Sequence, residues 1–157
     1  MQDMRIAVDT RSLEPGSIFQ PAVFTMEVLR LLTIQHPEHQ FLLFTDVLAA
    51  GLPQLPGNLL RVTISPRRTN LLLYKWWYDV KLPLALKKYK IDVFIGANGI
   101  GSLTSAVPQI LFLHDLAFFQ KNKHTAATAD TYRKRYFRRF VTKAKTVLTQ
   151  PLWVRYE

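Results

Sequence analysis

Short apolar runs alternate with helical patterns along the chain, and this alternation limits the fold more than any other feature of the sequence. Near-continuous apolar runs are typical of strands that helices cover on both faces of a sheet. Strands that alternate with helices call for a mostly parallel sheet with right-handed crossovers. We therefore expect a Rossmann-like, three-layer α/β domain with strands at Met4–Val8, Gln40–Thr45, Leu59–Ile64, Ile91–Ile95, Gln109–Leu113 and Thr146–Thr149.

Three segments between these runs carry apolar residues at helical spacing. The first begins near Ala22 and ends at His36, because Pro37 disfavours helical geometry in the residue before it. The second covers Asn70–Lys90, and Pro83 within it should kink the helix or restart it. The third covers about Ala126–Thr142, with its aromatic residues on one side and most of its basic residues on the other.

The length and composition indicate a single globular domain. At 157 residues the chain is too short for two Rossmann domains, and we expect one domain at 1–149 followed by a short tail at 150–157. The chain has no cysteine, which excludes disulfides, thiolate metal sites and cysteine nucleophiles and is compatible with a reducing cytoplasm. No apolar run approaches the roughly 20 residues of a transmembrane helix. We therefore expect a cytoplasmic protein that is soluble or attached at the inner face of a membrane.

Positive charge dominates the surface that such a domain would present. The chain has 21 Lys and Arg against 11 Asp and Glu, a formal charge of +10. That excess favours an anionic partner, and nucleic acid, anionic lipid and phosphorylated sugar donors all satisfy the condition. Basic and aromatic residues occur together at Tyr74–Lys81 and Tyr132–Phe140, as they do in helices that lie on a bilayer. The alternative, favoured for the aromatic residues, is that these are core and the charges form a solvated face.

In a parallel sheet, ligands bind outside the carboxyl ends of the strands. The loop after Asp9 is one such place, because the N–H groups at the start of the following helix can hold a phosphate or a sugar hydroxyl. Arg11, Gly16 and Ser17 are its candidate substrate-binding residues. An ordinary connecting loop is an equal alternative, since Gly16 stands alone and neither G-x-G-x-x-G nor a Walker sequence is present.

Two further candidate sites follow the runs at Ile91–Ile95 and Gln109–Leu113. His114 could exchange a proton or bond a sugar hydroxyl, and Asp115 could bias its charge, so both are candidate catalytic residues. The alternative is structural, with Asp115 capping the next turn. In GANGIGS, Asn98 could bond a hydroxyl and Gly99 permits close approach of the backbone, although a plain turn is the favoured reading.

The sequence around the remaining histidines does not indicate a metal site. His36, His39 and His124 lie in or near turns without paired metal-ligand spacing, and we interpret them as surface residues. No serine lies in a nucleophile elbow and no H-E-x-x-H occurs, which disfavours acyl transfer and metal-dependent hydrolysis.

Taken together and in this order, the elements resemble one known family. The matching segments are MRIAVDTRSL, HPEHQFLLF, LPLALKKYKIDVFIG, the ANG loop, VPQILFLHDLAFF and YRKRYFRRFVTKAKTVLT, which extend over nearly the whole chain to about Thr149. In their order and spacing they resemble the amino-terminal domain of the retaining GT-B glycosyltransferases of family four.

The resemblance implies half of a two-domain transferase, with acceptor bound on this domain and nucleotide sugar mainly on a second one. His114 then corresponds to the family histidine that faces the transferred sugar. The loop around Gly16 approaches the donor diphosphate or the acceptor, and Asn98 and Gly99 line the acceptor side. The implied partners are a glycan or lipid-linked acceptor and a carboxyl-terminal donor domain, with no cofactor and no metal.

The sequence departs from the family at two places. The loop before the first helix reads EPGSIFQPAVF instead of a Gly-Gly or Gly-Ile-Gly run, and QPLWVRYE stands where the family continues into its second domain. The glutamate pair and the basic residue that grip the donor have no counterpart here. Stabilisation of a leaving diphosphate needs a preorganised, water-shielded cleft, so we expect this chain alone to be inactive. An exposed interdomain surface would also favour self-association.

Two other classes of function remain open. One is a basic module that binds nucleic acid, which the absence of any nucleic-acid-binding motif disfavours. The other is an adaptor at an anionic membrane surface that performs no chemistry.

Overall fold

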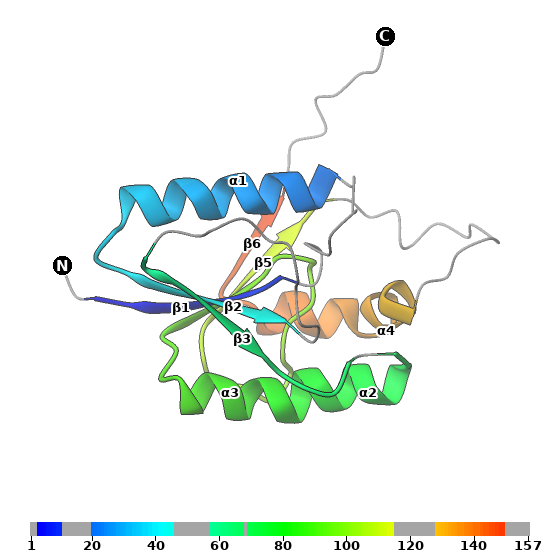
Figure 1. Ribbon diagram of the computed structural model, residues 1–157. Coiled ribbons are helices and arrows are strands. Elements are labelled where there is room, and N and C mark those ends of the chain that lie inside the picture. Colours follow the sequence, from blue (N-terminus) through cyan, green and yellow to red (C-terminus); the bar gives the residue numbers. More distant parts are fainter. Residues whose placement is uncertain (1–2, 11–19, 46–56, 68, 115–127, 150–157) are drawn as a thin grey trace, which may run out of the picture.

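A six-stranded, fully parallel sheet forms the centre of the computed structural model (Figure 1). The structure describes residues 3–10, 20–45, 57–67, 69–114 and 128–149. The strands are β1 Arg5–Asp9, β2 Gln40–Thr45, β3 Leu59–Thr63, β4 Val93–Gly96, β5 Gln109–Leu113 and β6 Thr146–Thr149. Their order across the sheet is β3-β2-β1-β4-β5-β6, which is that of a doubly wound Rossmann-like fold. The predicted fold class and all six predicted strands are confirmed, with shifts of one or two residues at their ends.

Helices cover both faces of the sheet and complete three layers. The helix α1, Gln20–Gln35, lies on one face, and α4, Thr128–Lys143, lies on the other (Figure 1). Beside α4 runs a continuous helical segment made of α2, Leu71–Trp76, a π-helical turn η2, Trp77–Lys81, and α3, Leu82–Lys88. None of the helices in the described part of the chain is long and apolar enough to cross a membrane.

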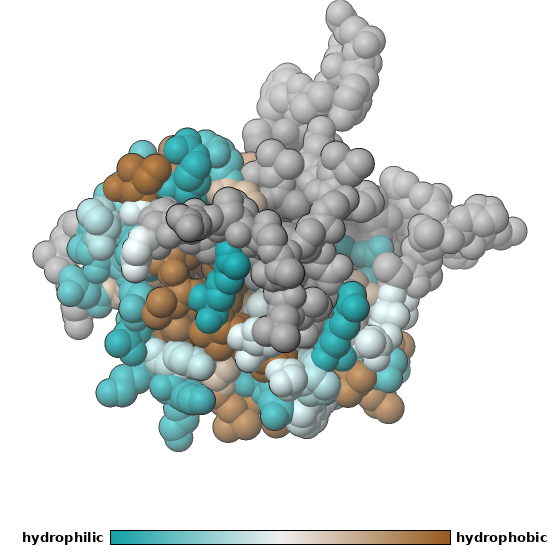
Figure 2. All heavy atoms as spheres, in the orientation of Figure 1, coloured by the Kyte–Doolittle hydropathy of each residue, from teal (hydrophilic) through white to brown (hydrophobic). Residues whose placement is uncertain are grey.

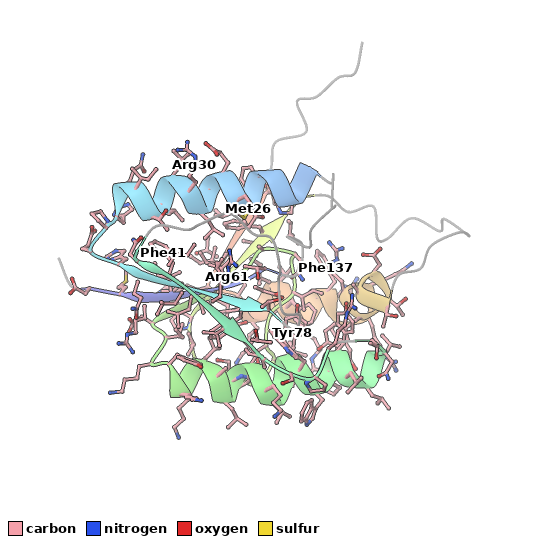
Figure 3. The ribbon with its side chains drawn as sticks, viewed as in Figure 1. Met26, Arg30, Phe41, Arg61, Tyr78 and Phe137 are labelled. Atoms are coloured by element: carbon pink, nitrogen blue, oxygen red, sulfur yellow. The ribbon has the colours of Figure 1, made fainter. Side chains whose placement is uncertain are left out.

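The inner strands are apolar on both faces because each face carries its own core. Successive residues of a strand point to opposite sides of the sheet, so alternate residues of each strand pack in the two cores. The larger core, beneath α2, η2, α3 and α4, receives Ala7, Leu42, Phe94 and Leu111. The smaller core, beneath α1, receives the next residue of each strand, namely Val8, Leu43, Ile95 and Phe112. In Figure 3, Met26 and Phe41 lie between α1 and the sheet, and Tyr78 lies on the opposite side.

The aromatic residues of the basic helices belong mainly to the larger core, as the favoured alternative predicted. Tyr74, Trp77 and Tyr78 are fully buried, and the indole Nε1 of Trp77 donates to the Ile64 carbonyl at 3.0 Å. Trp76 differs from them, because it is 38% exposed on the outer side of the helix. One side of the aromatic and basic segment Tyr74–Lys81 therefore packs in the core, and the other side exposes Trp76 at the surface.

Pro83 causes the irregularity predicted within the second helical segment. Proline has no N–H to offer the carbonyl four residues earlier, which here belongs to Asp79. The helix widens into the π-helical turn η2 immediately before Pro83, and the Thr104 hydroxyl donates to the Asp79 carbonyl at 2.6 Å. The irregular turn therefore becomes the point where the helix is tied to the segment between β4 and β5.

Candidate functional site

The carboxyl ends of β1, β4 and β5 meet at one edge of the sheet. The strand β4 pairs with β1 on one side and with β5 on the other, and all three run in the same direction. Asp9 therefore lies near Asn98, which follows β4, and His114, which follows β5. This is the edge where a parallel sheet binds its ligands.

A buried network joins the end of β1 to the η2 turn. The Tyr78 hydroxyl donates a hydrogen bond to Oδ2 of Asp9, and both residues are 0% exposed. The amide Nδ2 of Asn98 donates to the same oxygen at 3.4 Å and to the Tyr78 hydroxyl at 3.2 Å. Because a buried carboxylate is costly without hydrogen-bond donors, these contacts fix where the backbone leaves β1.

A tight turn brings Asn98 to this network. The Gly99 N–H donates to the Gly96 carbonyl at 3.1 Å, and Oδ1 of Asn98 accepts from the Ile100 N–H at 3.1 Å. Gly99 has a φ of 73°, and a Cβ atom there would lie 2.8 Å from Cδ2 of Leu113. The positive φ favours glycine at position 99, and a Cβ atom there would also force the end of the Leu113 side chain to shift. This geometry agrees with the plain-turn alternative for GANGIGS, and the binding role of Asn98 and Gly99 stays a prediction.

His114 lies at the same edge, on the α1 side of the sheet. Its Nε2 is 2.9 Å from the Ala97 carbonyl oxygen, and its ring meets Phe24 and Phe112 edge-on at centroid distances of 5.5 and 6.4 Å. A carbonyl can only accept, so Nε2 carries a proton, and a neutral ring has its lone pair on Nδ1. The aromatic contacts and the Ala97 bond together set the direction of the imidazole.

The two consecutive residues Ala97 and Asn98 connect the two halves of the edge. The carbonyl of Ala97 accepts from His114 on the α1 side, while the side chain of Asn98 reaches Asp9 and Tyr78 on the α4 side. Any ligand that moved this dipeptide would therefore perturb both groups at once.

The segment after the turn is also held firmly. Gln109, which is 2% exposed, accepts from the Ser102 N–H at 2.7 Å and donates to the Ser102 carbonyl at 2.8 Å. Oδ1 of Asp79 accepts from the Leu103 N–H at 2.9 Å. The connection from β4 to β5 is thus fastened to the first residue of β5 and to the η2 turn.

The structure brings together some of the residues singled out from the sequence. Asn98, Gly99 and His114 lie at the carboxyl edge. Ala97, which precedes Asn98 in the chain, contacts His114 through its carbonyl. Arg11, Gly16, Ser17 and Asp115 lie outside the described residues, so their roles stay predictions.

Sequence reasoning missed Asp9 and Tyr78 as members of this site. Asp9 offered one signal, because it is a charged residue that ends a buried apolar strand. Tyr78 offered none beyond its place in an aromatic helix, since its partner is 69 residues away. A long-range polar pair of this kind becomes visible only when the sheet is assembled.

A layer of tyrosines lies behind Asp9. The ring of Tyr132 stacks on Tyr78 at 5.9 Å between centroids, and it contacts Tyr74 and Tyr136 at 5.5 and 4.9 Å. Burial raises the pKa of the Tyr132 phenol well above its ordinary range, and the negative charge of Asp79 raises it further. The Tyr132 hydroxyl has no hydrogen-bond partner among the described residues. This layer is consequently a neutral, low-dielectric backing for the polar edge.

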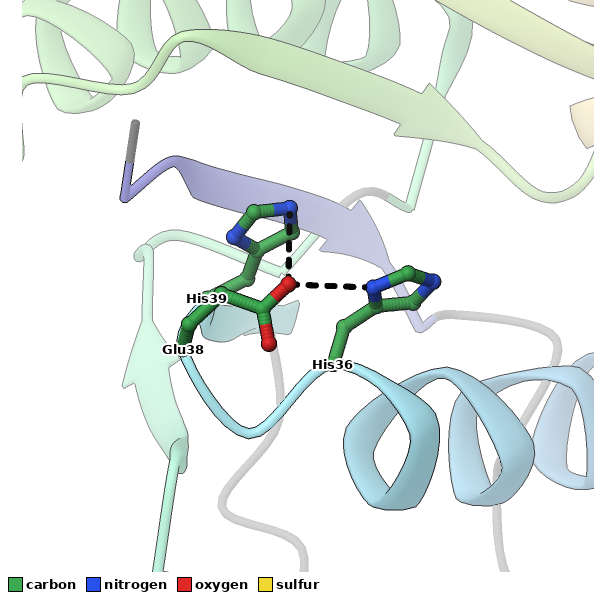
Figure 4. Close-up of side chains that lie close together, drawn as sticks. All are labelled: His36, Glu38 and His39. Carbon is green, nitrogen blue, oxygen red and sulfur yellow. Dashed lines mark hydrogen bonds and ion pairs between the residues drawn. The ribbon is translucent and has the colours of Figure 1, made fainter. Parts of the chain in front are cut away.

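A second polar cluster, formed by His36, Glu38 and His39, lies in the turn between α1 and β2 (Figure 4). The interpretation of His39 as a surface residue is wrong, because it is 9% exposed. One ligand atom from each of the three residues lies within 4.8 Å of the others, a proximity that the spacing of the histidines in the sequence did not indicate. His36 is half-buried, and His124 lies outside the described residues.

These observations define the chain as a Rossmann-like α/β domain with a polar site at the carboxyl edge of its sheet. In comparisons with known proteins, no family model and no curated protein sequence matches the chain.

Proposed function

We propose that the chain is the acceptor-binding half of a GT-B glycosyltransferase, which transfers a sugar from a nucleotide-sugar donor to a glycan or lipid-linked acceptor. The observation that supports it best is the meeting of Asp9, Asn98 and His114 at one edge of a doubly wound parallel sheet. The segments that carry the resemblance supply the polar groups found at that edge. A transferase of this kind would use polar groups at this edge to bind its acceptor.

The chemistry of the edge suits a neutral polyhydroxylated ligand. Sugar hydroxyls both donate and accept hydrogen bonds. The imidazole of His114, which is oriented by the Ala97 carbonyl and by the Phe24 and Phe112 rings, can form a hydrogen bond with such a hydroxyl in a fixed orientation. Asn98 contributes a half-buried amide that is already oriented by Asp9 and Tyr78. In this proposal His114 and Asn98 position the acceptor and the transferred sugar, and a second domain holds the nucleotide diphosphate.

Backbone NMR spectra of the labelled chain test the binding site directly. Titration with maltose, mannobiose and cellobiose, each in separate samples, should shift the amide signals of Ala97, Asn98, Gly99 and His114. A His114→Gln variant should weaken the binding, while Glu27→Gln, which alters an exposed ion pair on α1, should not. If none of the three sugars produces shifts at the carboxyl edge, the proposal fails.

The division between two domains has its own test. Because the proposal assigns the diphosphate to a second domain, the 157 residues by themselves should release no sugar from UDP-glucose or GDP-mannose. Robust turnover of either donor by the pure chain would contradict this division of labour, even if acceptor binding at the edge held.

A second function, attachment to an anionic membrane surface, is favoured by the outer side of α2, η2 and α3. This side carries an exposed apolar stripe made of Leu72, Trp76, Val80 and Leu84, which are 80, 38, 42 and 60% exposed. In Figure 2, apolar and hydrophilic side chains lie side by side along the lower border of the molecule, where α2 and α3 run. The Lys81 ammonium lies 4.8 Å from the centre of the Trp76 ring. Apolar residues at four-residue spacing next to lysines suit the headgroup region of an anionic bilayer.

Flotation with vesicles separates this function from nucleic-acid binding. The chain should float with phosphatidylglycerol vesicles more than with phosphatidylcholine vesicles, and less as salt is raised. A Leu72→Ser/Leu84→Ser variant should lose flotation, whereas Ile34→Ser removes an equally exposed apolar residue, 58% exposed, from α1 and should not. Equal flotation of the two variants, or binding to an oligonucleotide in place of vesicles, would exclude a membrane role for the stripe.

A further inference from the structure

We propose that His36, Glu38 and His39 form a binding site for a divalent transition metal, of the class of Zn²⁺, at the edge of the sheet opposite the candidate sugar site. Two imidazole nitrogens and one carboxylate oxygen are a donor set that suits Zn²⁺, Co²⁺ and Ni²⁺. The three ligand atoms lie within 4.8 Å of one another. This inference does not depend on the proposed transferase function.

Each imidazole has one ring nitrogen near the same carboxylate oxygen of Glu38. Nδ1 of His36 lies 3.1 Å from Oε1 of Glu38, and Nε2 of His39 lies 3.9 Å from the same oxygen (Figure 4). The two rings are nearly parallel, with an interplanar angle of 10° and a centroid distance of 5.4 Å. Ligands about 2.1 Å from a tetrahedral metal lie roughly 3.4 Å apart, so the three atoms need to close by little more than an ångström.

The backbone of the turn is fixed before any metal binds. Nδ2 of Asn58, which directly precedes β3, donates to the carbonyls of Thr33, His36 and His39 at 3.2, 3.4 and 3.1 Å. The His39 N–H also donates to the His36 carbonyl at 3.1 Å. A single amide thus holds the backbone of both histidines, and most of the ordering that a metal site needs is present in the metal-free chain.

Exposure is graded across the cluster in a way that suits metal entry. The His39 side chain is 10% exposed, that of Glu38 is 27% and that of His36 is 40%. The buried imidazole anchors the site, and the two more exposed ligands can adjust to the metal from the solvent side. A fourth tetrahedral position is left for water.

Metal binding has a definite consequence for the ring protons. A carboxylate accepts, so His36 now has its proton on Nδ1, and that proton would move to Nε2 when Nδ1 ligates the metal. The Met4 N–H donates to Nδ1 of His39 at 3.5 Å, the outer limit of a hydrogen bond, and this weak bond would be lost when Nε2 ligates the metal and the ring proton moves to Nδ1. Each neutral ring carries one proton before and after metal binding, so the rearrangement needs no oxidant and changes no net proton count.

The location separates this cluster from the candidate sugar site. Met4, His39 and Asn58 directly precede β1, β2 and β3, so the cluster lies at the amino ends of the strands. The candidate sugar site follows the carboxyl ends of β1, β4 and β5. Metal binding should therefore leave the amide signals of Asn98 and His114 unchanged.

Calorimetric titration of the metal-free chain, prepared without a polyhistidine tag, with ZnCl₂ tests the site. We expect one Zn²⁺ per chain, and a melting temperature raised by about 5 to 10 °C at a hundredfold excess over Kd. His36→Gln and Glu38→Gln should each weaken binding by about tenfold or more. Because both side chains are partly exposed, these variants should keep the fold, which circular dichroism checks.

Glu27→Gln is the matched control for Glu38→Gln, since it removes an exposed carboxylate on α1 that pairs with Arg30 and is not part of the cluster, and it should bind Zn²⁺ as the parent chain does. Absence of Zn²⁺ binding would overturn the proposal. Binding that survives both cluster substitutions, or that is lost in Glu27→Gln, would do the same because the metal would then lie elsewhere.

Discussion

The Tyr78 hydroxyl donates a hydrogen bond to the Asp9 carboxylate, although the two residues are 69 positions apart and both are fully buried. This bond links the end of the central strand β1 to the irregular turn η2. The Asn98 amide joins the same pair, which extends the network to the turn after β4. The carboxyl edge of the sheet is therefore organised around one buried acid.

Removing this hydroxyl should weaken the whole domain. In Tyr78→Phe, Asp9 loses a buried donor while the ring and its packing remain, and we expect the free energy of unfolding to fall by about 1 to 3 kcal/mol. Urea denaturation at neutral pH measures the change. Tyr89→Phe is the control, because that half-buried ring keeps its contacts with Phe44 and Lys88 without the hydroxyl. Equal stability of the two variants would show that the Asp9 network contributes little.

A side chain at position 99 should destabilise the domain. Alanine there would adopt an unfavourable φ of 73°, and its Cβ would lie 2.8 Å from Cδ2 of Leu113, next to His114. We expect Gly99→Ala to lower the free energy of unfolding by about 1 to 3 kcal/mol and to shift the NMR signals of the His114 ring. Gly57→Ala provides the comparison, because a Cβ there meets nothing within 4 Å. If both alanine variants melt at the same temperature, the strain assigned to position 99 is absent.

The strands were predictable because their signal is local. Each inner strand is apolar on both faces, and a run such as Gln40–Thr45 can satisfy that pattern only between two layers of helices. The same local reasoning located Pro83 as a break, since the missing N–H of proline is a property of one residue. It did not predict the form of the break, because the Thr104 hydroxyl that meets the Asp79 carbonyl comes from 25 residues away.

The sites were less predictable because they depend on long-range placement. His114 and Asn98 were identified from the rule that ligands bind at strand ends, which needs only the order of elements. The burial of His39 was missed, since it depends on Asn58 and Met4 from the starts of two other strands. No periodicity in the sequence around His39 carries that information.

The tie between Thr104 and the π-helical turn should be measurable. Thr104→Val keeps the shape of the side chain but removes the donor to the Asp79 carbonyl, which Pro83 cannot supply from within the helix. We expect a loss of about 0.5 to 1.5 kcal/mol in the free energy of unfolding. In Thr142→Val the hydroxyl that is lost donates to the Arg138 carbonyl inside the continuous helix α4, so that control should change little. A loss of the same size in the control would mean that the cost comes from the valine itself.

Removing the Tyr132 hydroxyl should not destabilise the domain, in contrast to removing the Tyr78 hydroxyl. Its hydroxyl is buried without a partner among the described residues, so Tyr132→Phe removes a desolvated polar group and should leave the free energy of unfolding at pH 7 unchanged or raise it by up to about 1 kcal/mol.

The pH dependence follows from the same burial, which raises the pKa of Tyr132 in the folded chain. Above the ordinary tyrosine pKa of about 10, the unfolded chain releases this proton while the folded chain retains it. The contribution of the protonated Tyr132 to the free energy of unfolding is therefore fully present below pH 10. It falls as the pH rises further, by up to about 1.4 kcal/mol per pH unit. Urea denaturation at pH 9, 10 and 11 should show a steeper decline for the parent chain than for Tyr132→Phe. Parallel declines would mean that Tyr132 ionises in the folded chain as it does in water, and that its hydroxyl is hydrated.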